Sequence, residues 1–314
     1  MELPDAFFHG LTASIAFVST ASAAQAPVPP DDGALITVTA RRTGIPVWRV
    51  QSGASTIVLV GSIPDIPEGT RWNAQALDAA IGQSRGVLFP QTVGLTANRI
   101  GLDWWMVRWG KQSQLPAGQT LSSMLDPVDL ARLGRLAGKK LVARDWDNIH
   151  PLHLALKMQS DLRESTAMGP NLDEAVEESI KKHKVYRVPF AQTDAGPVMR
   201  RLFASRPQDH VACLKATLAV IDAGPDELRR RSKAWADRDV IAATASPVQA
   251  IEAACWPANA GKAVDPNLFA EVTRTLKRKG ATLAVINLDT LARRGGLLDK
   301  LQAAGITIDG PAWK

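Results

Sequence analysis

Residues 55–63 have the sequence STIVLVGSI, and this stretch decides the fold. Its β-branched and aliphatic residues predict a strand. The unbroken apolar run Ile57–Val60 is typical of a strand that is buried on both faces of a sheet. The run leads into Gly61, which lets the chain turn sharply where the strand ends. The ends of such strands are where α/β proteins build their sites.

The segments on either side of this strand in the sheet are also visible in the sequence. Pro46–Gln51 is a second β-rich run, and the short turn Ser52–Ala54 joins it to residues 55–63, which predicts a β-hairpin. Near the C-terminus, helix and strand signals alternate: a helix from Asp265 to a glycine cap at Gly280, a buried strand at Thr282–Leu288, a helix at Gly296–Ala304 and a last strand at Ile306–Ile308.

The middle of the chain is mainly helical in its pattern. Helices are predicted at Trp72–Gln83, Asp126–Gly138, Asn171–Lys184 and Asp222–Asp239, and short strands at Gly86–Pro90 and Val185–Phe190. We therefore expect an α/β fold in which a central mixed β-sheet is flanked by helices, the middle section is helical, and the N- and C-terminal thirds share the sheet.

The N-terminus resembles an export signal. Leu11–Ala26 carries no charge and ends in repeated alanines that resemble an Ala-x-Ala processing site, and it is too short and too weakly apolar for a membrane span. Met1–Gly10 lacks Lys and Arg and carries Glu2 and Asp5, so either the true start lies elsewhere or the signal is atypical.

These features divide the chain into three parts. We assign residues 1–26 to a signal peptide, residues 27–43 to an N-terminal tail or an extra strand, and residues 44–314 to the folded domain. The β-branched alternation of Ala34–Thr43 is the reason for considering a strand there. The protein is expected to be periplasmic or secreted in a bacterium, with no transmembrane segment in the mature chain.

The composition is that of an ordinary globular protein, with a net charge of +6 and two cysteines. The basic run Arg229–Lys233 alternates with nearby acids, which predicts a solvated helix face, and export makes nucleic acid an unexpected partner. Cys213 and Cys255 do not form a CxxC motif, which excludes a zinc knuckle or a thioredoxin-type pair. Whether they form a disulfide with each other is left open by the sequence.

Two segments resemble a known family. Pro46–Ile63 resembles the opening hairpin of the TraB/GumN (TraB/PrgY/GumN) family, which is related to the Tiki metalloproteases and to the erythromycin esterase and ChaN-like proteins. The signature of this family is an apolar strand that runs into Gly-Ser/Thr-x-His. Phe269–Ile308 resembles its ending, where a strand leads to a second Gly-x-x-His ahead of a Gly-Leu-Leu helix, matched here by Gly295–Leu301.

The resemblance covers about residues 44–310. It implies an α/β fold with a central mixed sheet and a divalent metal site where the two motifs meet. The metal ligands of the family are replaced in this chain. Pro64 stands at the first histidine position, and its ring offers no donor atom to a metal.

The second motif has also changed. It has become Asn287-Leu288-Asp289-Thr290, in which Asn287 replaces the glycine and Thr290 replaces the histidine. A carboxylate expected after the second strand is replaced by Pro90 or Gln91. Catalytic metals take roughly three protein ligands, so the site is predicted to be vestigial. Its positions are Gly61, Ser62, Pro64, Asn287, Asp289 and Thr290.

These replacements favour a pseudo-metallohydrolase, a non-catalytic protein without a metal cofactor that binds a peptide, glycan or protein of the cell envelope in the cleft its active relatives use. Trp105 and Trp109 share a helical face and are candidates for stacking on such a ligand, although large aromatic side chains more often belong to the core. A purely structural protein with a filled cleft is a further hypothesis, which an apolar pocket near Gly61 and Asp289 would contradict.

The alternative is an active metal-dependent peptidase or hydrolase with relocated ligands. His150, His153 and Asp147 are the candidates for holding Zn, Mn or Co, although the spacing of the two histidines favours a structural role. Asp65 and Asp289 are a weaker candidate pair for a hard cation or for acid/base chemistry. The remaining histidines in this region, His183 and His210, are predicted to lie on the surface.

Overall fold

The predicted hairpin is present. β1 (Val47–Ser52) and β2 (Ser55–Ser62) pair antiparallel, and every residue of β2 is buried. At the turn, Gly53 has a φ of +58°, a conformation that glycine adopts without strain. The computed structural model describes residues 32–89, 113–137, 146–170, 172–189, 202, 205–255 and 268–314.

The hairpin belongs to a mixed six-stranded sheet with the order β4-β3-β5-β2-β1-β6. The other strands are β3 (Gly86–Leu88), β4 (Tyr186–Arg187), β5 (Gly280–Asn287) and β6 (Thr307–Asp309). β5 lies parallel to β2 along its whole length, and β6 pairs antiparallel with β1. Strands from both ends of the chain therefore share one sheet, which confirms the predicted α/β class.

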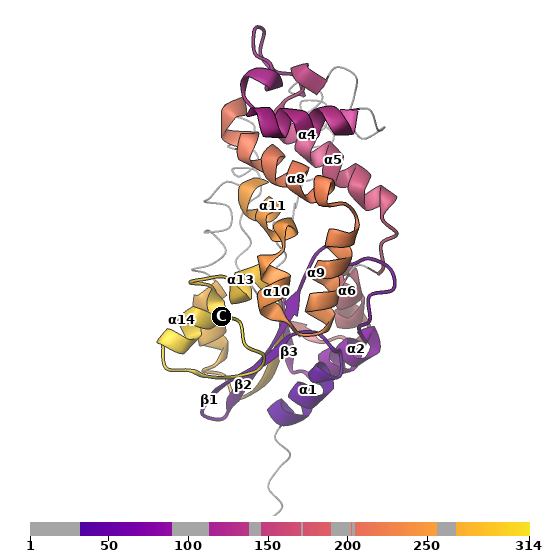
Figure 1. Cartoon of the computed structure of the whole chain (residues 1–314). Helices are drawn as coiled ribbons and strands as arrows, with labels where there is room; N and C mark the ends of the chain where they lie inside the picture. Colours follow the sequence, from indigo (N-terminus) through magenta and orange to yellow (C-terminus); the bar gives the residue numbers. More distant parts are fainter. Residues whose placement is uncertain are drawn as a thin grey trace, which may run out of the picture. The chain divides into compact units, whose positions relative to one another are not determined.

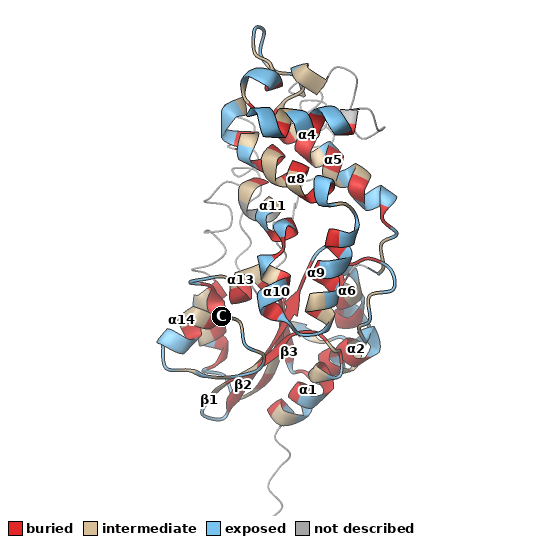
Figure 2. Ribbon diagram, viewed as in Figure 1, coloured by how far each residue is buried: buried red, intermediate tan, exposed pale blue. Residues whose placement is uncertain are grey.

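Helices cover both faces of the sheet (Figure 1). α1 (Asp32–Arg41), α2 (Ala74–Gln83) and α6 (Leu172–His183) pack together on one side, and α13 (Leu288–Ala292) and α14 (Leu297–Ala303) lie on the other. Burial is concentrated in the sheet and in the helix faces that turn toward it (Figure 2). This double cover explains the unbroken apolar sequence of β2.

One predicted element is wrong. Ala34–Thr43 was expected as a strand or tail, whereas the structure forms helix α1 from Asp32 to Arg41. The buried residues Gly33, Ile36, Thr37 and Ala40 recur at helical spacing and pack on the sheet and α2. The β-branched residues of this segment favour a strand only weakly, and burial of one helical face outweighs that preference.

The helical middle section has a hydrophobic core of its own. It is built mainly from α4 (Pro127–Ala137), α5 (Pro151–Ser165), α8 (Val211–Ala223) and α11 (Pro247–Cys255), with the short helices η1 (Leu121–Ser123), η2 (Trp146–Asn148) and η3 (Pro207–His210). α4 begins as predicted, because the Asp126 carboxylate accepts hydrogen bonds from the amides of Val128 and Asp129.

Helix α9 (Asp226–Ala236), which is followed by α10 (Val240–Ala245), belongs to both cores. Its first half places Leu228 in the core of the helical section, and its second half places Trp235 in the core around the sheet. α9 therefore connects the helical section to the sheet, because its side chains pack in both cores. The compact unit that contains all of these elements is Asp31–Lys314.

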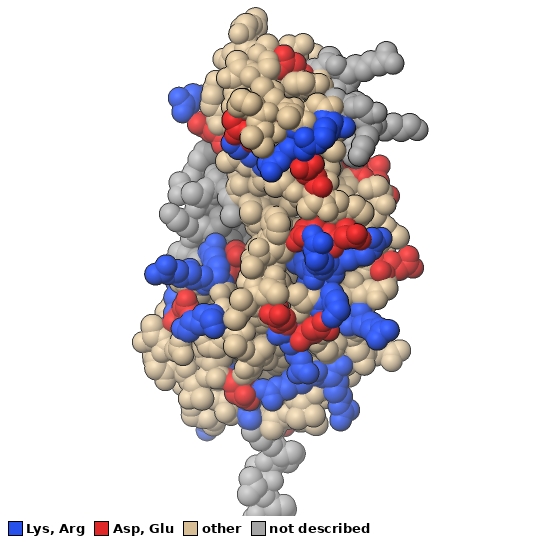
Figure 3. All heavy atoms as spheres, in the orientation of Figure 1, with Lys and Arg blue, Asp and Glu red and all other residues tan. Residues whose placement is uncertain are grey.

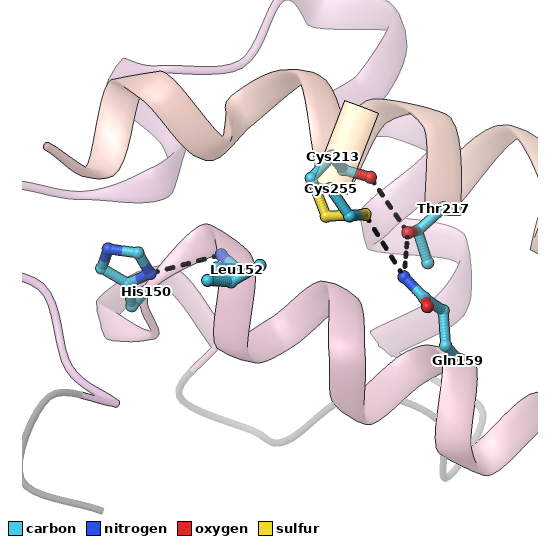
Figure 4. The surroundings of a disulfide bond; sticks show 6 residues. All are labelled: His150, Leu152, Gln159, Cys213, Thr217 and Cys255. Atoms are coloured by element: carbon cyan, nitrogen blue, oxygen red, sulfur yellow. Dashed lines mark hydrogen bonds between the residues drawn. A yellow bond between two sulfur atoms is a disulfide. The ribbon is translucent and has the colours of Figure 1, made fainter. Parts of the chain in front are cut away.

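The two cysteines form a disulfide, which answers a question that the sequence left open. Cys213 of α8 and Cys255 at the end of α11 have Cα atoms 4.4 Å apart. Beside the bond, the Gln159 side chain from α5 donates to the Thr217 hydroxyl at 2.9 Å and contacts the Cys255 sulfur at 3.6 Å (Figure 4). The disulfide thus ties α8 to α11 in the part of the helical core that α5 also lines.

Within the described ranges, none of the helices has both the length and the apolar character needed to cross a bilayer. The predicted signal segment, residues 1–26, and residues 27–31 lie outside these ranges.

Candidate functional site

The two motif segments meet at the carboxyl ends of neighbouring parallel strands. Ser62, the last residue of β2, lies opposite Asn287, the last residue of β5, and Gly61 lies opposite Ile286. The structure therefore brings together the motif positions that the sequence analysis placed at one site. Such strand ends are where open α/β sheets hold their sites.

Gly61 is held by close packing on several sides. A Cβ atom at this position would stand 2.8 Å from the Leu288 side chain and 3.2 Å from the ring of Trp48. The Gly61 amide donates to the carbonyl of Pro46 at 2.9 Å, and its carbonyl accepts from the Trp235 indole at 2.7 Å. This glycine is therefore required by the packing of the strand end and not by the predicted sharp turn, because β2 continues to Ser62 and the φ of Gly61 is not positive.

Two side chains from α9 fill the space beside the first motif. Arg231 is only 2% exposed, and its guanidinium donates to the carbonyl of Pro64 and, at 3.2 Å, to that of Asp65. Trp235 follows one turn later on the same face and also packs edge-on against Trp72, with ring centroids 5.9 Å apart. The strand end and the turn at Pro64 and Asp65 are thus covered by a buried cation and an indole.

This finding corrects the prediction that the Arg229–Lys233 run is a solvated helix face. Arg229, Arg230 and Lys233 are exposed, but Arg231 is buried. The sequence contains a signal for this arrangement, because Leu228, Arg231 and Trp235 are spaced at i, i+3 and i+7 and so share one helical face. Arg231 lies on this buried face, although the charged residues beside it in the sequence indicate an exposed helix.

Burial of Arg231 is matched by an acidic residue one turn earlier. Glu227 is buried and accepts hydrogen bonds from Arg230 and, at 2.8 Å, from the Ser246 hydroxyl. Burial by itself would raise the pKa of Glu227, but the bonds to Arg230 and Ser246 and the charges of Arg230 and Arg231 lower it. Glu227 is thus ionised, and its charge favours the guanidinium.

The two carboxylates near the motifs are each engaged by an arginine. Asp65 Oδ1 lies 2.8 Å from Arg163 Nε, and Asp289 Oδ2 lies 3.9 Å from Arg293 Nη1. Asp65 also has a φ of +55°, which is uncommon for an aspartate. These pairings speak against the hypothesis that the two carboxylates act together on a cation.

Within the described ranges, the residues of the second motif form the start of helix α13. The Asn287 side-chain oxygen accepts from the Asp289 amide at 2.9 Å and so caps the first turn of α13. Thr290, at the position where the family resemblance implies a histidine, is half-buried within the same short helix. The asparagine therefore has a local reason to be there, because it starts the helix where the strand ends.

The residues at this site do not fit a divalent metal. Pro64 has no side-chain donor, the Asn287 oxygen is used as a helix cap, and a guanidinium lies against the adjacent carbonyls. Across the described ranges, no group of three or more His, Cys, Asp or Glu residues is arranged to hold a metal ion. Pro90 and Gln91, the candidates for the third position, lie outside those ranges.

The alternative ligands have other partners or positions. Asp147 accepts from the amide and the hydroxyl of Ser122, at 2.7 and 3.1 Å. His150 is the N-cap of α5, and its Nδ1 accepts from the Leu152 amide at 3.3 Å (Figure 4). His153 lies in the first turn of the same helix. In this structure His150 therefore serves to start α5.

His210 is a further residue that the sequence analysis misplaced. It was predicted on the surface, but it is buried, its Nε2 lies 3.1 Å from the Leu202 carbonyl, and its ring centroid is 5.3 Å from that of His150. His183 does lie on the surface, next to Asp78. Burial of His210 follows from its place at the start of α8, between α8 and α5, which a local charge pattern does not reveal.

Three histidines therefore gather at the starts of α5 and α8. Burial lowers the pKa of His150 to about 4, with further lowering from the charges of His210 and His153. Burial also lowers the pKa of His153, helped by Lys157, and that of His210, where the Leu202 carbonyl and Asp209 oppose it. All three imidazoles are neutral at pH 7.

The remaining site predictions are placed as follows. Trp105 and Trp109 lie outside the described ranges. A shallow depression of about 310 Å³ lies well away from the motifs, between the start of α4 and α8, where Asp126, Asp129, Arg132 and Lys215 form an ion-pair network.

Together these features define an α/β protein whose two motif strands meet at one sheet edge, under side chains from a helix of the middle section. The chain belongs to the TraB/PrgY/gumN family, whose sequence model matches residues 46–309. No curated protein and no solved structure matches the chain.

Proposed function

We propose that the chain is a non-catalytic member of the TraB/PrgY/gumN family that works in the bacterial envelope by binding a peptide, glycan or protein instead of hydrolysing a substrate. The observation that carries the proposal is the position of Arg231. Its buried guanidinium covers the carbonyls of Pro64 and Asp65, at the place where the family resemblance implies a metal ligand.

The charge of Arg231 explains why a metal would not bind here. An arginine side chain stays protonated at any physiological pH, so it brings a permanent positive charge to the strand end. Removed from water, this charge repels a divalent cation more strongly than it would in solvent. Neither Pro64 nor Thr290 supplies an imidazole whose bond to a metal would offset that repulsion. Metal binding at the carboxyl ends of β2 and β5 is therefore unfavourable.

The envelope part of the proposal rests on two other observations. The uncharged segment Leu11–Ala26 resembles an export signal, and the Cys213–Cys255 disulfide is a bond that persists in oxidising compartments. Osmotic-shock fractionation of cells that produce the full chain, or a chain without residues 1–26, tests this part. The full chain is expected in the shock fluid, and retention of both forms in the cytoplasm would contradict it.

The catalytic part is tested by thermal unfolding of the chelator-treated protein with and without Zn, Mn, Co and Mg. A ligand that binds only the native state stabilises it by about 2.7 kcal/mol when its concentration is about 100 times its dissociation constant. We expect no saturable rise in Tm with any of the four ions, and no chelator-sensitive hydrolysis of peptide substrates.

The variant His153→Ala separates the two hypotheses about catalysis. A saturable metal-induced rise in the wild-type protein that is lost in His153→Ala would establish the relocated-ligand alternative. A rise that both proteins share would place a metal elsewhere in the chain. Either result would overturn the non-catalytic proposal.

A further inference from the structure

The edge of the sheet opposite the motifs carries a concentration of positive charge. Strands β2, β5, β3 and β4 run parallel, so all four begin at that edge. The residues just ahead of three of them are basic and exposed: Arg85 before β3, Lys184 before β4, and Lys277, Arg278 and Lys279 before β5. We call these five residues the basic edge.

Contacts between neighbouring strands hold the basic edge together. The Arg85 side chain lies across Gly280, where a Cβ atom would stand 2.8 Å from Arg85 Cδ, and the Arg85 amide donates to Ala281 at 3.2 Å. The Ser55 hydroxyl donates to the Arg278 carbonyl at 2.6 Å, which fixes the Lys277–Lys279 turn beside the start of β2. Gly86 pairs with Tyr186, so Lys184 lies on the other side of Arg85.

The charge of the basic edge is not neutralised within the described part of the chain. None of its five side chains forms an ion pair there. The nearby acids are engaged by other residues, because Asp78 is bound by Lys182 and His183, and Glu271 by Arg274. Asp32 lies at the start of α1, whose first turn packs beside the start of β2 at this end of the sheet. Clustered basic residues of this kind attract an anionic surface.

Exposed apolar side chains accompany the charge. Tyr186, the first residue of β4, is 55% exposed, and Leu35, in the first turn of α1, is 54% exposed. Gly33 packs against Thr56 at the start of β2, so the first turn of α1 lies at the same end of the sheet as the β1–β2 turn (Figure 1). Tyrosine is enriched at membrane–water interfaces, because its ring is apolar and its hydroxyl group is polar.

The chain also enters the folded unit at this edge. The uncharged segment Leu11–Ala26 is joined to Asp32 by the short stretch PVPPD. We infer that the basic edge docks on the surface of a bilayer rich in anionic phospholipid headgroups. The choice of lipid over nucleic acid rests on the proposed envelope location.

The test is co-sedimentation of the full chain with phosphatidylcholine vesicles that contain either no phosphatidylglycerol or about a third of it. The test variant combines Arg85→Gln, Lys277→Gln and Lys279→Gln. Each basic residue near an anionic surface strengthens attachment by about fivefold, so this variant is expected to bind the anionic vesicles about a hundredfold more weakly.

The matched control removes the same charge from the opposite edge, with Arg42→Gln, Arg71→Gln and Arg294→Gln. These exposed residues lie near the carboxyl end of the sheet, where Asn73 bonds to Thr43 and α13 follows β5. Its binding should stay close to that of the wild-type protein. Equal losses in both variants would show that net charge alone is responsible and would overturn the proposal.

A salt titration of the wild-type protein provides a test that needs no variant. Binding to anionic vesicles should fall steeply between about 0.05 and 0.5 M salt, because the Debye length shortens over this range. Salt-independent binding that is equal on both vesicle types would assign attachment to the apolar segment and overturn the proposal. So would tighter binding to a DNA duplex than to the anionic vesicles at the same salt.

Discussion

The indole of Trp235 donates a 2.7 Å hydrogen bond to the carbonyl oxygen of Gly61, so α9 is fixed to the glycine of the first motif. Arg231, one turn earlier, bonds to the two carbonyls that follow at Pro64 and Asp65. Two side chains of a single helix thus bond to three residues, Gly61 at the strand end and Pro64 and Asp65 in the turn after it. The packing of this helix therefore supports both the strand end and the turn that follows it.

Replacement of the buried arginine should therefore weaken the fold. Arg231→Met keeps much of the side-chain volume but leaves the carbonyls of Pro64 and Asp65 without their donor, which is expected to lower the free energy of unfolding by about 2 kcal/mol. Urea denaturation measures the change. The control Arg229→Met, at an exposed position paired with Asp226, should change it by less than about 0.5 kcal/mol. Equal effects would contradict the assigned role.

Two glycine-to-alanine substitutions should change the free energy of unfolding in opposite directions. Gly61→Ala forces a methyl group against Leu288 and Trp48 and is expected to destabilise the protein by about 1–3 kcal/mol. Gly134→Ala, inside α4 with open space around it, should stabilise it by about 0.5–1 kcal/mol. Thermal unfolding of the two variants side by side checks the pair, and a neutral Gly61→Ala would show that the strand end is loosely packed.

Removal of the disulfide should be costly. The bond joins residues separated by 42 positions, and closing a loop of that length stabilises the folded state by about 4 kcal/mol in the chain-entropy model. Cys213→Ser combined with Cys255→Ser is expected to lose most of this in urea denaturation. A reducing agent should weaken the wild-type protein and leave the double variant unchanged. Insensitivity of the wild-type protein to reduction would argue against the bond.

Stability should fall as the pH is lowered from about 6.5 toward 4. The pKa of His150 in the folded protein is about 4, below its ordinary value of 6.5, so the unfolded chain binds a proton in this interval that the folded chain does not. The contribution of His150 to the free energy of unfolding is fully present above pH 6.5. It is lost as the pH falls toward the pKa of His150 in the folded protein. The lowered pKa values of His153 and His210 act in the same direction.

His150→Asn provides the comparison. Asparagine caps a helix well and does not titrate, so the variant keeps the cap of α5 and removes one proton-binding group. Free energies of unfolding measured at intervals between pH 7 and 4.5 should decline less steeply than for the wild-type protein. Parallel curves for the two proteins would mean that His150 is accessible to protons in the folded state.

The sequence was sufficient for the parts of the fold in which local pattern and burial agree. The hairpin at 46–63, the strand predicted at 282–288 and the helix predicted at 296–304 are strongly patterned segments. The structure forms them at 47–62, 280–287 and 297–303. The meeting of the two motifs also followed from the resemblance, because both stand directly after apolar strands that pair in parallel.

The features that were missed depend on contacts between distant segments. α1 is helical because one face packs on the sheet and α2, although its β-branched residues favour a strand. Arg231 looked solvated because its neighbours in sequence are charged, while its partners, Pro64 and Asp65, lie far away along the chain. The distance between Cys213 and Cys255 depends in the same way on how α8 and α11 pack.

The parallel pairing of β2 with β5 has a consequence for the order of folding. β2 lies at the centre of the sheet, yet its neighbour on one side is supplied by the last part of the chain. Pairing over such a separation is slow, so β2 spends time during synthesis with an open apolar edge. A chain cut before Gly280 would keep that edge open permanently, and aggregation through edge-to-edge pairing is the outcome expected for it.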